Sequence, residues 1–290
     1  GIAIVAAWIA VCGVALTLSG SIAATLVHQI AVVFAATAMM AALGAVDDIR
    51  PIPVIPRLVV QFACVGGVIA ILPPDFHMTP WLPWWLERVL LVLAGVWFVN
   101  LVNFMDGLDW MTVAEMVPLA AGLVLLGTLG ALPPYAIICA LALLGALLGF
   151  APFNRPIARL FLGDVGSLPL GLIVGWLLAL LANKGHLGAA LLLPLYYLMD
   201  ASLTLLRRLS KGERVWQAHR THFYQRATDN GYTVKQVVGC IFVLNIILGA
   251  LAVACIVFNT PAVEVASLVA GCVATSSLLF MFSKRRQCVS

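Results

Sequence analysis

The chain alternates long apolar runs with short polar breaks, a pattern that predicts a bundle of membrane-spanning helices. A helix needs roughly 20 apolar residues to cross a bilayer, and ten runs come close to or exceed that length. The expected spans are residues 1–18, 22–46, 57–72, 86–105, 112–130, 135–151, 167–183, 187–206, 235–257 and 263–282. The breaks contain Gly, Pro, Asn or Ser, which end helices. We therefore expect an all-α, polytopic membrane protein forming a single domain over residues 1–290.

The composition supports this prediction. Hydrophobic residues make up 63% of the 290 residues and charged residues 10%, whereas a soluble domain carries about 25% charged residues. The net charge of +4 does not indicate nucleic-acid binding, because the bases are scattered over the loops. Six of the seven cysteines lie in apolar runs, which favours packing over disulfides or zinc. The chain opens in an apolar run without Met, so we expect the natural protein to begin earlier.

The distribution of Lys and Arg predicts how the helices thread. Ten consecutive spans place fourteen of the sixteen bases in one set of loops, while the other set holds Arg88 and Lys184. Because cytoplasmic loops are enriched in Lys and Arg, the basic set is expected to face the cytoplasm. Its polar loops lie at about 47–57, 103–111, 152–166 and 207–234.

Five aspartates fall at the ends of expected helices on this cytoplasmic side: Asp47, Asp48, Asp106, Asp109 and Asp164. Charged groups at a bilayer are costly, so such a cluster is a functional hypothesis by default. The dipole at a helix C-terminus disfavours two adjacent carboxylates unless a cation compensates them. Asp47 and Asp48 therefore suggest a general base or a share in a metal site. A solvated helix end neutralised by Arg50 is the alternative.

Asn103 and Asp106 are three residues apart and share a helix face if the helix persists that far. An amide oxygen beside a carboxylate suits Mg²⁺ that also binds water and substrate phosphates, whereas a helix cap with Asx turns is the alternative. Gly107 would let the backbone turn and approach a ligand. Asp164 lies between two glycines in a segment that either folds tightly around a ligand or caps the following helix.

The cytoplasmic loop 207–234 contains two histidines three residues apart, His219 and His222, together with Arg220 and Arg226. These four side chains could bind a diphosphate. Zinc is less favoured, because no second pair of ligands lies nearby.

Two further acids lie within expected spans. Asp200 is near a cytoplasmic end, where it is either a site residue or the partner of an arginine such as Arg207. Glu115 lies one helical turn into a span, and the sequence assigns it no role.

Four motifs together resemble the polyprenyl-phosphate N-acetylhexosamine-1-phosphate transferase family, glycosyltransferase family 4. They are 46–50 (VDDIR), 100–109 (NLVNFMDGLD), Asn154 with 161–167 (FLGDVGS), and 219–226 (HRTHFYQR). They occur in the family's order and span most of the chain. The family typically has eleven spans, so the ten expected here resemble that fold without its first helix and first loop.

The 219–226 motif resembles the bacterial O-antigen and capsule branch of the family. The run of three histidines usual in the peptidoglycan branch is absent from the sequence. Trp110 and Met111 stand where the family commonly has Gly and a small residue, which leaves the sugar or nucleotide preference open. N-acetylglucosamine, N-acetylfucosamine and N-acetylquinovosamine all remain candidates.

The resemblance implies a UDP-linked N-acetylhexosamine donor, undecaprenyl phosphate as acceptor, and a site facing the cytoplasm at a bacterial inner membrane. The lipid phosphate attacks the sugar-linked phosphate, and UMP leaves. Mg²⁺, or Mn²⁺ in its place, bound by Asp164 and by Asn103 or Asp106, would bridge the diphosphate oxygens.

Asp47 or Asp48 would deprotonate the lipid phosphate or orient it. Orientation is a fair rival role, because a phosphate monoester has a second pKa of about 6 and is mostly ionised at neutral pH. The remaining motif residues have implied binding roles: His219, Arg220, His222 and Arg226 toward the diphosphate or sugar, and Asp109 and Asn154 toward the nucleotide or sugar.

Two other classes compete with a transferase. An ion-coupled transporter would also carry intramembrane carboxylates, but its site would lie near the bilayer midplane within paired repeats, and no repeat is evident. A non-catalytic scaffold in a glycan-assembly complex is disfavoured by the intact set of acids. A homodimer is left open, since Gly145 and Gly149 could pack within one chain or between two.

Overall fold

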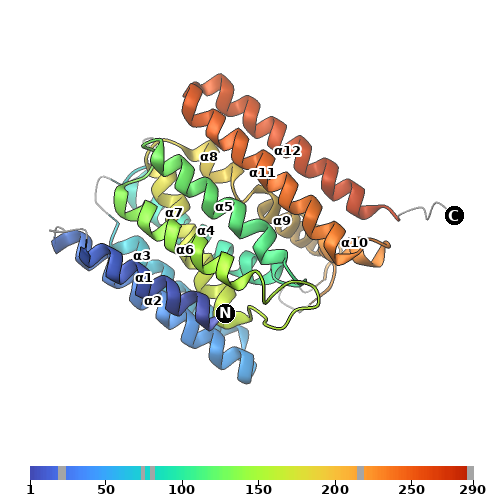
Figure 1. Ribbon diagram of the computed structural model, residues 1–290, viewed down its shortest axis with the longest axis horizontal. Helices are drawn as coiled ribbons and strands as arrows, with labels where there is room; N and C mark the ends of the chain where they lie inside the picture. Colours follow the sequence, from blue (N-terminus) through green and yellow to red (C-terminus); the bar gives the residue numbers. More distant parts are fainter. Residues whose placement is uncertain (19–23, 73–75, 79–81, 214–218, 286–290) are drawn as a thin grey trace.

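The computed structural model describes residues 1–18, 24–72, 76–78, 82–213 and 219–285, and these residues form helices and connecting loops. The helices are α1 (Ile2–Leu18), α2 (Ala24–Ile49), α3 (Val54–Ala70), α4 (Trp84–Met105), α5 (Met111–Thr128), α6 (Pro134–Phe150), α7 (Asp164–Asn183), α8 (Leu187–Leu192), α9 (Leu195–Ser210), α10 (Phe223–Asp229), α11 (Val234–Phe258) and α12 (Pro261–Ser283). Figure 1 shows most of them packed as a bundle, with α1–α3 at one side and α11 and α12 at the other. The expected all-α fold is confirmed.

Within the part of the chain that the structure describes, six helices are long and apolar enough to cross a membrane: α2, α4, α5, α7, α11 and α12. Three others, α1, α3 and α6, are apolar but have 17 residues each. At 1.5 Å per residue they reach about 25 Å, slightly less than the roughly 30 Å hydrocarbon core of a bilayer. The chain is a multi-pass membrane protein, and the count of ten spans stays a prediction.

The expected span 187–206 is wrong as a single helix. The structure divides it into α8 and α9, with the break at Leu193 and Pro194. Proline lacks a backbone N–H and its ring clashes with the carbonyl four residues earlier, so a helix rarely continues through it. α9 then runs on to Ser210, with Arg207 and Arg208 in its last turn, where the helix dipole favours positive charge.

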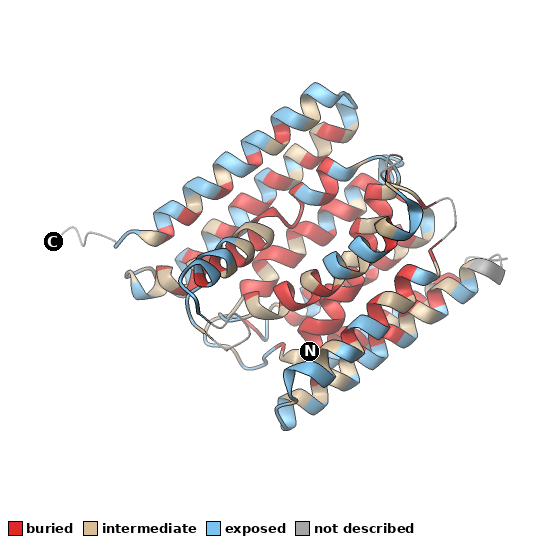
Figure 2. Ribbon diagram, turned by 180° about the vertical axis from the view of Figure 1, so that it is seen from behind, coloured by how far each residue is buried: buried red, intermediate tan, exposed pale blue. Residues whose placement is uncertain are grey.

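The helix α7 lies at the centre of the bundle. Fifteen of its 20 residues are buried, and it packs against α1, α2, α4 and α8. A helix that is apolar on all sides is stable only when protein or lipid surrounds it. Figure 2 shows buried residues concentrated in the interior of the bundle. Contacts at Asp164 place the N-terminal end of α7 beside the C-terminal ends of α2 and α4, and this junction carries the candidate site.

Candidate active site

The last turn of α2 meets the first turn of α7 through Asp48. Its Oδ1 accepts a hydrogen bond from the Asp164 backbone N–H at 2.9 Å, and its Oδ2 accepts one from the Val165 N–H at 3.1 Å. The first N–H groups of a helix have no partner within it, and a carboxylate there is stabilised by the helix dipole. Asp48 therefore caps α7. The alternative that Asp164 is the cap is wrong, because the N-cap position belongs to Gly163.

Gly163 is required by the geometry of this junction. Its φ is 64° and its ψ is 176°, a conformation that is essentially restricted to glycine. A Cβ added there would lie 2.6 Å from the Asp48 Oδ2. The backbone of the loop can therefore approach the capping carboxylate only because residue 163 has no side chain.

Asp47 takes part in an ion-pair cluster with α3. Its Oδ1 accepts a hydrogen bond from the Ile52 N–H. Its Oδ2 lies 3.2 Å from the Arg57 Nη1, which is also 3.9 Å from the Asp164 Oδ2. Arg57 thus bridges two of the expected site aspartates. From the sequence, Arg57 was one of many basic residues expected on the cytoplasmic side, and no site role was predicted for it. Its position in the expected 47–57 loop, close to Asp47, was the one feature that could have indicated such a role.

Asn103, in the last turn of α4, contacts the Asp164 carboxylate from another side. Its Nδ2 lies 2.7 Å from the Asp164 Oδ1 and 2.8 Å from the Ser167 Oγ. Asp106 is the C-cap residue of α4, and its Oδ1 accepts a hydrogen bond from the Thr112 hydroxyl. Burial raises the pKa of Asp106 to about 6, and the nearby Asp164 carboxylate adds to this rise against the lowering effect of Thr112.

The junction gathers more negative than positive charge. Asp47, Asp48, Asp106 and Asp164 converge there, and Arg57 supplies one guanidinium. Among the described residues, no three His, Cys, Asp or Glu side chains are arranged as a complete metal cage. Mg²⁺ commonly binds through one or two carboxylates and completes its shell with water and phosphate oxygens. Hard oxygen donors with unbalanced negative charge fit such a partly open site.

The histidine segment is held by Asp200, which is fully buried in α9. Its Oδ1 accepts a hydrogen bond from the Phe223 N–H at 3.0 Å and lies 3.2 Å from the His222 Nδ1. Its Oδ2 accepts hydrogen bonds from the Tyr224 N–H and the Tyr196 hydroxyl, both at 3.1 Å. Asp200 therefore caps α10. The suggested pairing of Asp200 with an arginine is corrected to a pairing with His222.

The four expected phosphate ligands of this segment have different environments. His222 is 3% exposed, and its ring stacks on that of His219 at a centroid distance of 4.9 Å. Burial, followed by the proximity of His222 and Arg208, lowers the pKa of His219 to about 4. Arg220 is exposed. The guanidinium of Arg226 lies over the Phe223 ring at 5.8 Å.

The short helix α10 packs directly on the turn that holds Asp106. The Tyr224 hydroxyl donates a hydrogen bond to the Phe104 carbonyl at 3.1 Å and accepts one from the Gln225 Nε2 at 3.0 Å. A Cβ on Gly107 would lie 2.1 Å from the Tyr224 hydroxyl. The expected close approach at Gly107 is therefore to Tyr224, and it joins the histidine segment to the carboxylates.

Comparison with known proteins decides the family. The model of a family described as "Glycosyl transferase family 4" matches residues 30–182, which is more than half of the chain and includes Asp47 through Asp164. The chain belongs to glycosyl transferase family 4. The resemblance of the four motifs is thereby confirmed for this family of polyprenyl-phosphate hexosamine-1-phosphate transferases.

Curated relatives within glycosyl transferase family 4 share a common description. A phospho-N-acetylmuramoyl-pentapeptide-transferase of Limosilactobacillus fermentum is 29% identical over 186 residues, covering 63% of this chain and 56% of the relative. One of Desulfotalea psychrophila is 32% identical over 191 residues, covering 59% and 51%. One of Chlamydia trachomatis is 40% identical over 105 residues, covering 34% and 31%. The chain spans about half the length of the first two relatives.

Two further residues of the family motifs organise the loop between α6 and α7. The Asp109 Oδ2 accepts a hydrogen bond from the Ala158 N–H at 3.0 Å. Asn154 is 4% exposed, and its amide joins the Trp110 N–H to the Leu160 carbonyl, both at 2.9 Å. In this structure both side chains form hydrogen bonds with the backbone of this loop. Their contacts with nucleotide or sugar stay a prediction.

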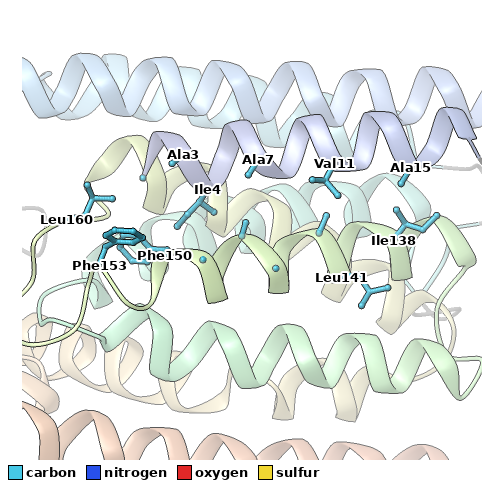
Figure 3. A pocket seen from close by; sticks show the side chains of 15 residues that line it. Ala3, Ile4, Ala7, Val11, Ala15, Ile138, Leu141, Phe150, Phe153 and Leu160 are labelled. Carbon is cyan, nitrogen blue, oxygen red and sulfur yellow. The ribbon is translucent and has the colours of Figure 1, made fainter.

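An apolar groove of about 790 Å³ runs between α1 and α6. Figure 3 shows Ala3, Ala7 and Ala15 on one wall and Phe150 and Phe153 at the end nearest the 151–163 loop. Gly145 and Gly149, the residues considered for helix packing, also line it, and a Cβ on either would meet no atom within 4 Å. The homodimer stays a prediction.

Proposed function

We propose that this chain transfers an N-acetylhexosamine 1-phosphate from a UDP-sugar to undecaprenyl phosphate, releasing UMP and forming a lipid-diphosphate sugar. The observation that carries the proposal is the convergence of Asp47, Asp48, Asn103, Asp106 and Asp164 at one end of the bundle in a family 4 chain. An acceptor with an isoprenoid tail stays in the bilayer. A site at helix ends therefore lets its phosphate meet a soluble nucleotide donor.

The carboxylates would hold Mg²⁺ or Mn²⁺ through Asp164, Asp106 and the Asn103 amide oxygen. The fit rests on the unbalanced negative charge and the hard oxygen donors of the junction. When bound, the cation neutralises the negative charge of the donor diphosphate.

The reaction forms a bond from a lipid phosphate oxygen to the sugar-linked phosphorus and breaks the phosphoanhydride bond to UMP. Because the lipid phosphate is mostly ionised at neutral pH, Asp47 and Asp48 need not remove a proton. Asp48 already accepts two hydrogen bonds from α7, and Asp47 is paired with Arg57. We assign them orienting roles: Asp48 positions Asp164, and Asp47 positions Arg57 beside the phosphates.

The histidine segment would bind the diphosphate or the sugar of the donor. Arg220 and Arg226 supply positive charge, and His219 supplies a neutral imidazole near pH 7 because its pKa is lowered to about 4. His222 is buried against Asp200, so its role is to hold the segment in place. The single pair of histidines favours the O-antigen and capsule branch, with the site facing the cytoplasm of a bacterium.

Transport is the weaker candidate. The break between α8 and α9 resembles the broken helices of carriers, but those breaks come in paired repeats. The described helices contain no second break of this kind inside an expected span. Membership of a transferase family also weighs against a transporter.

The test is UMP release from a panel of UDP-N-acetylhexosamines by the full natural protein with undecaprenyl phosphate. We expect release to need both lipid and Mg²⁺, to stop on addition of EDTA, and to resume with excess Mg²⁺. Asp164→Asn should lower the rate at least a hundredfold, since charge stabilisation of phosphates dominates such transfers. Asp229→Asn, at an exposed position, is the matched control. No release from any donor by folded protein would refute the proposal.

A further inference from the structure

Gln61 of α3 and Asn100 of α4 form a buried contact, called here the amide pair, that the proposed reaction does not use. Gln61 is 0% exposed and Asn100 is 8% exposed. The Asn100 Nδ2 donates a hydrogen bond to the Gln61 Oε1 at 2.6 Å, and the Gln61 Nε2 donates one to the Asn100 Oδ1 at 3.3 Å. An unpaired amide is costly to bury, so the amide pair favours one placement of α3 against α4.

The amide pair lies in a closely packed part of the interface between α3 and α4. The Asn100 Nδ2 also donates a hydrogen bond to the Val96 carbonyl of its own helix at 2.8 Å, which restricts rotation of the amide. About one turn away, a Cβ on Gly95 would lie 2.7 Å from the Val65 Cγ1. From the first contact to the second, residue numbers rise along α3 and fall along α4, so the two helices are antiparallel.

One turn in the opposite direction leads from the amide pair to the candidate site. On α3, Arg57 lies four residues before Gln61, and on α4, Asn103 lies three residues after Asn100. Residues three or four apart lie on the same helix face. The Arg57 Nη1 lies 3.9 Å from the Asp164 Oδ2, and the Asn103 Nδ2 lies 2.7 Å from the Asp164 Oδ1. The amide pair is therefore one turn from two side chains that contact the same carboxylate.

Of these two side chains, Arg57 depends more on the placement of its helix. Asn103 is held by hydrogen bonds to α7, and α4 packs extensively on that central helix. Arg57 lies in the first turn of α3, and helix ends fray. Its Nε is buried without a hydrogen-bond partner among the described residues. The position of its guanidinium therefore depends on where the body of α3 is held.

We propose that the amide pair positions Arg57 beside the Asp164 carboxylate by joining α3 to α4. The inference rests on the proposed function, because it gives the amide pair a part in that reaction as a positioning device. A misplacement of about 1 Å can cost a hundredfold in rate. Two hydrogen bonds that fix the placement of one helix are therefore sufficient to affect turnover.

Steady-state kinetics of UMP release, expressed per folded protein, tests this inference. Gln61→Met keeps the length of the side chain but replaces the amide with a thioether, which has no donor and is a weak acceptor. We expect it to lower kcat/KM at least fivefold. Val65→Ala is the matched control, because Val65 is 3% exposed in the same interface and carries no polar atom. It should lower the thermal midpoint by creating a cavity and change kcat/KM by less than twofold.

A double-mutant cycle with Arg57→Gln separates positioning from a general loss of stability. If the amide pair acts through Arg57, Gln61→Met should change kcat/KM by less than twofold once Arg57 has been replaced. An equal loss from Gln61→Met with and without Arg57 would overturn the inference. Unaltered kcat/KM in Gln61→Met alone would overturn it too.

Hydrogen exchange provides a second readout that needs no turnover. Gln61→Met should speed amide exchange at the start of α3, in residues 54–58, whereas Val65→Ala should not. If the unchanged protein released no UMP, the proposed function would fail, and the exchange data alone would decide whether the amide pair holds this end of α3. The same exchange rates in Gln61→Met as in the unchanged protein would overturn the inference.

Discussion

Replacing Gly163 with alanine should damage both stability and activity, although the change adds one methyl group. The backbone conformation at φ 64° and ψ 176° costs a non-glycine residue about 1–3 kcal/mol. The new Cβ would lie 2.6 Å from the Asp48 Oδ2 and displace that carboxylate from the start of α7. Loss of a helix cap costs about 0.5–2 kcal/mol, so the two effects together come to about 1.5–5 kcal/mol.

The measurement compares Gly163→Ala with Gly185→Ala by denaturant midpoint and by UMP release. Gly185 also has a positive φ, 87°, but a Cβ there would meet no atom within 4 Å. Its replacement should cost about 1–2 kcal/mol for the left-handed backbone and leave activity unchanged. Gly163→Ala should lose more stability than this control and should lower the rate at least tenfold, because Asp48 positions Asp164.

A double-mutant cycle with Asp48→Ala identifies the cause. Once Asp48 has been removed, Gly163→Ala can no longer displace it, so the two substitutions together should cost less than their separate effects by about 0.5–2 kcal/mol. Additive effects, or a Gly163→Ala protein as stable and as active as Gly185→Ala, would refute the reasoning that Asp48 acts through the α7 N-terminus.

Two further predictions concern the histidine segment. Asp200→Asn should lower the free energy of unfolding by about 3–5 kcal/mol, because it breaks a buried charged network, and it should speed hydrogen exchange across α10. The exposed control Asp229→Asn should change the free energy of unfolding by less than about 0.5 kcal/mol. Equal effects of the two substitutions would contradict the anchoring role of Asp200. For His219, burial lowers the pKa from 6.5 to about 4, so the unfolded chain binds more protons between these values. Stability should therefore fall as the pH is lowered from 6.5 toward 4, and His219→Gln should flatten that part of a thermal-midpoint profile; an unchanged profile would show that His219 is not buried in solution.

Most of the helices could be predicted from the sequence, because apolar runs and the residues that end them are local properties. Asp47 and Asp48 fall in the last turn of α2, and Asn103 lies in the last turn of α4, as the run lengths indicated. The break at Pro194 was missed, and a proline alone did not mark it, because α5 and α7 continue through Pro118 and Pro169. The apolar run continues on both sides, so hydropathy alone indicated one helix.

The roles of several site residues could not be predicted, because they depend on partners far apart in the chain. Asp48 caps a helix that begins 116 residues later, and a capping contact at that distance has no signature in the local sequence. The sequence does not distinguish Arg57 from the other basic residues. In the structure α3 packs beside α2 and places Arg57 between Asp47 and Asp164. The sequence left the role of Asp200 open, because its partners at the start of α10 come close to it only in the folded protein.

The sequence by itself determined that this protein is an all-helical membrane protein of glycosyl transferase family 4 with acids at its helix ends. The lengths of the apolar runs and the short motifs are sufficient for this assignment, because each is a property of a short stretch of sequence. Only the tertiary structure decided which acids meet, which carboxylate caps α7, and that Asp200 holds the histidine segment. Those outcomes follow from the close packing of helices around α7, where burial makes an unpaired polar group costly and so favours arrangements that pair it.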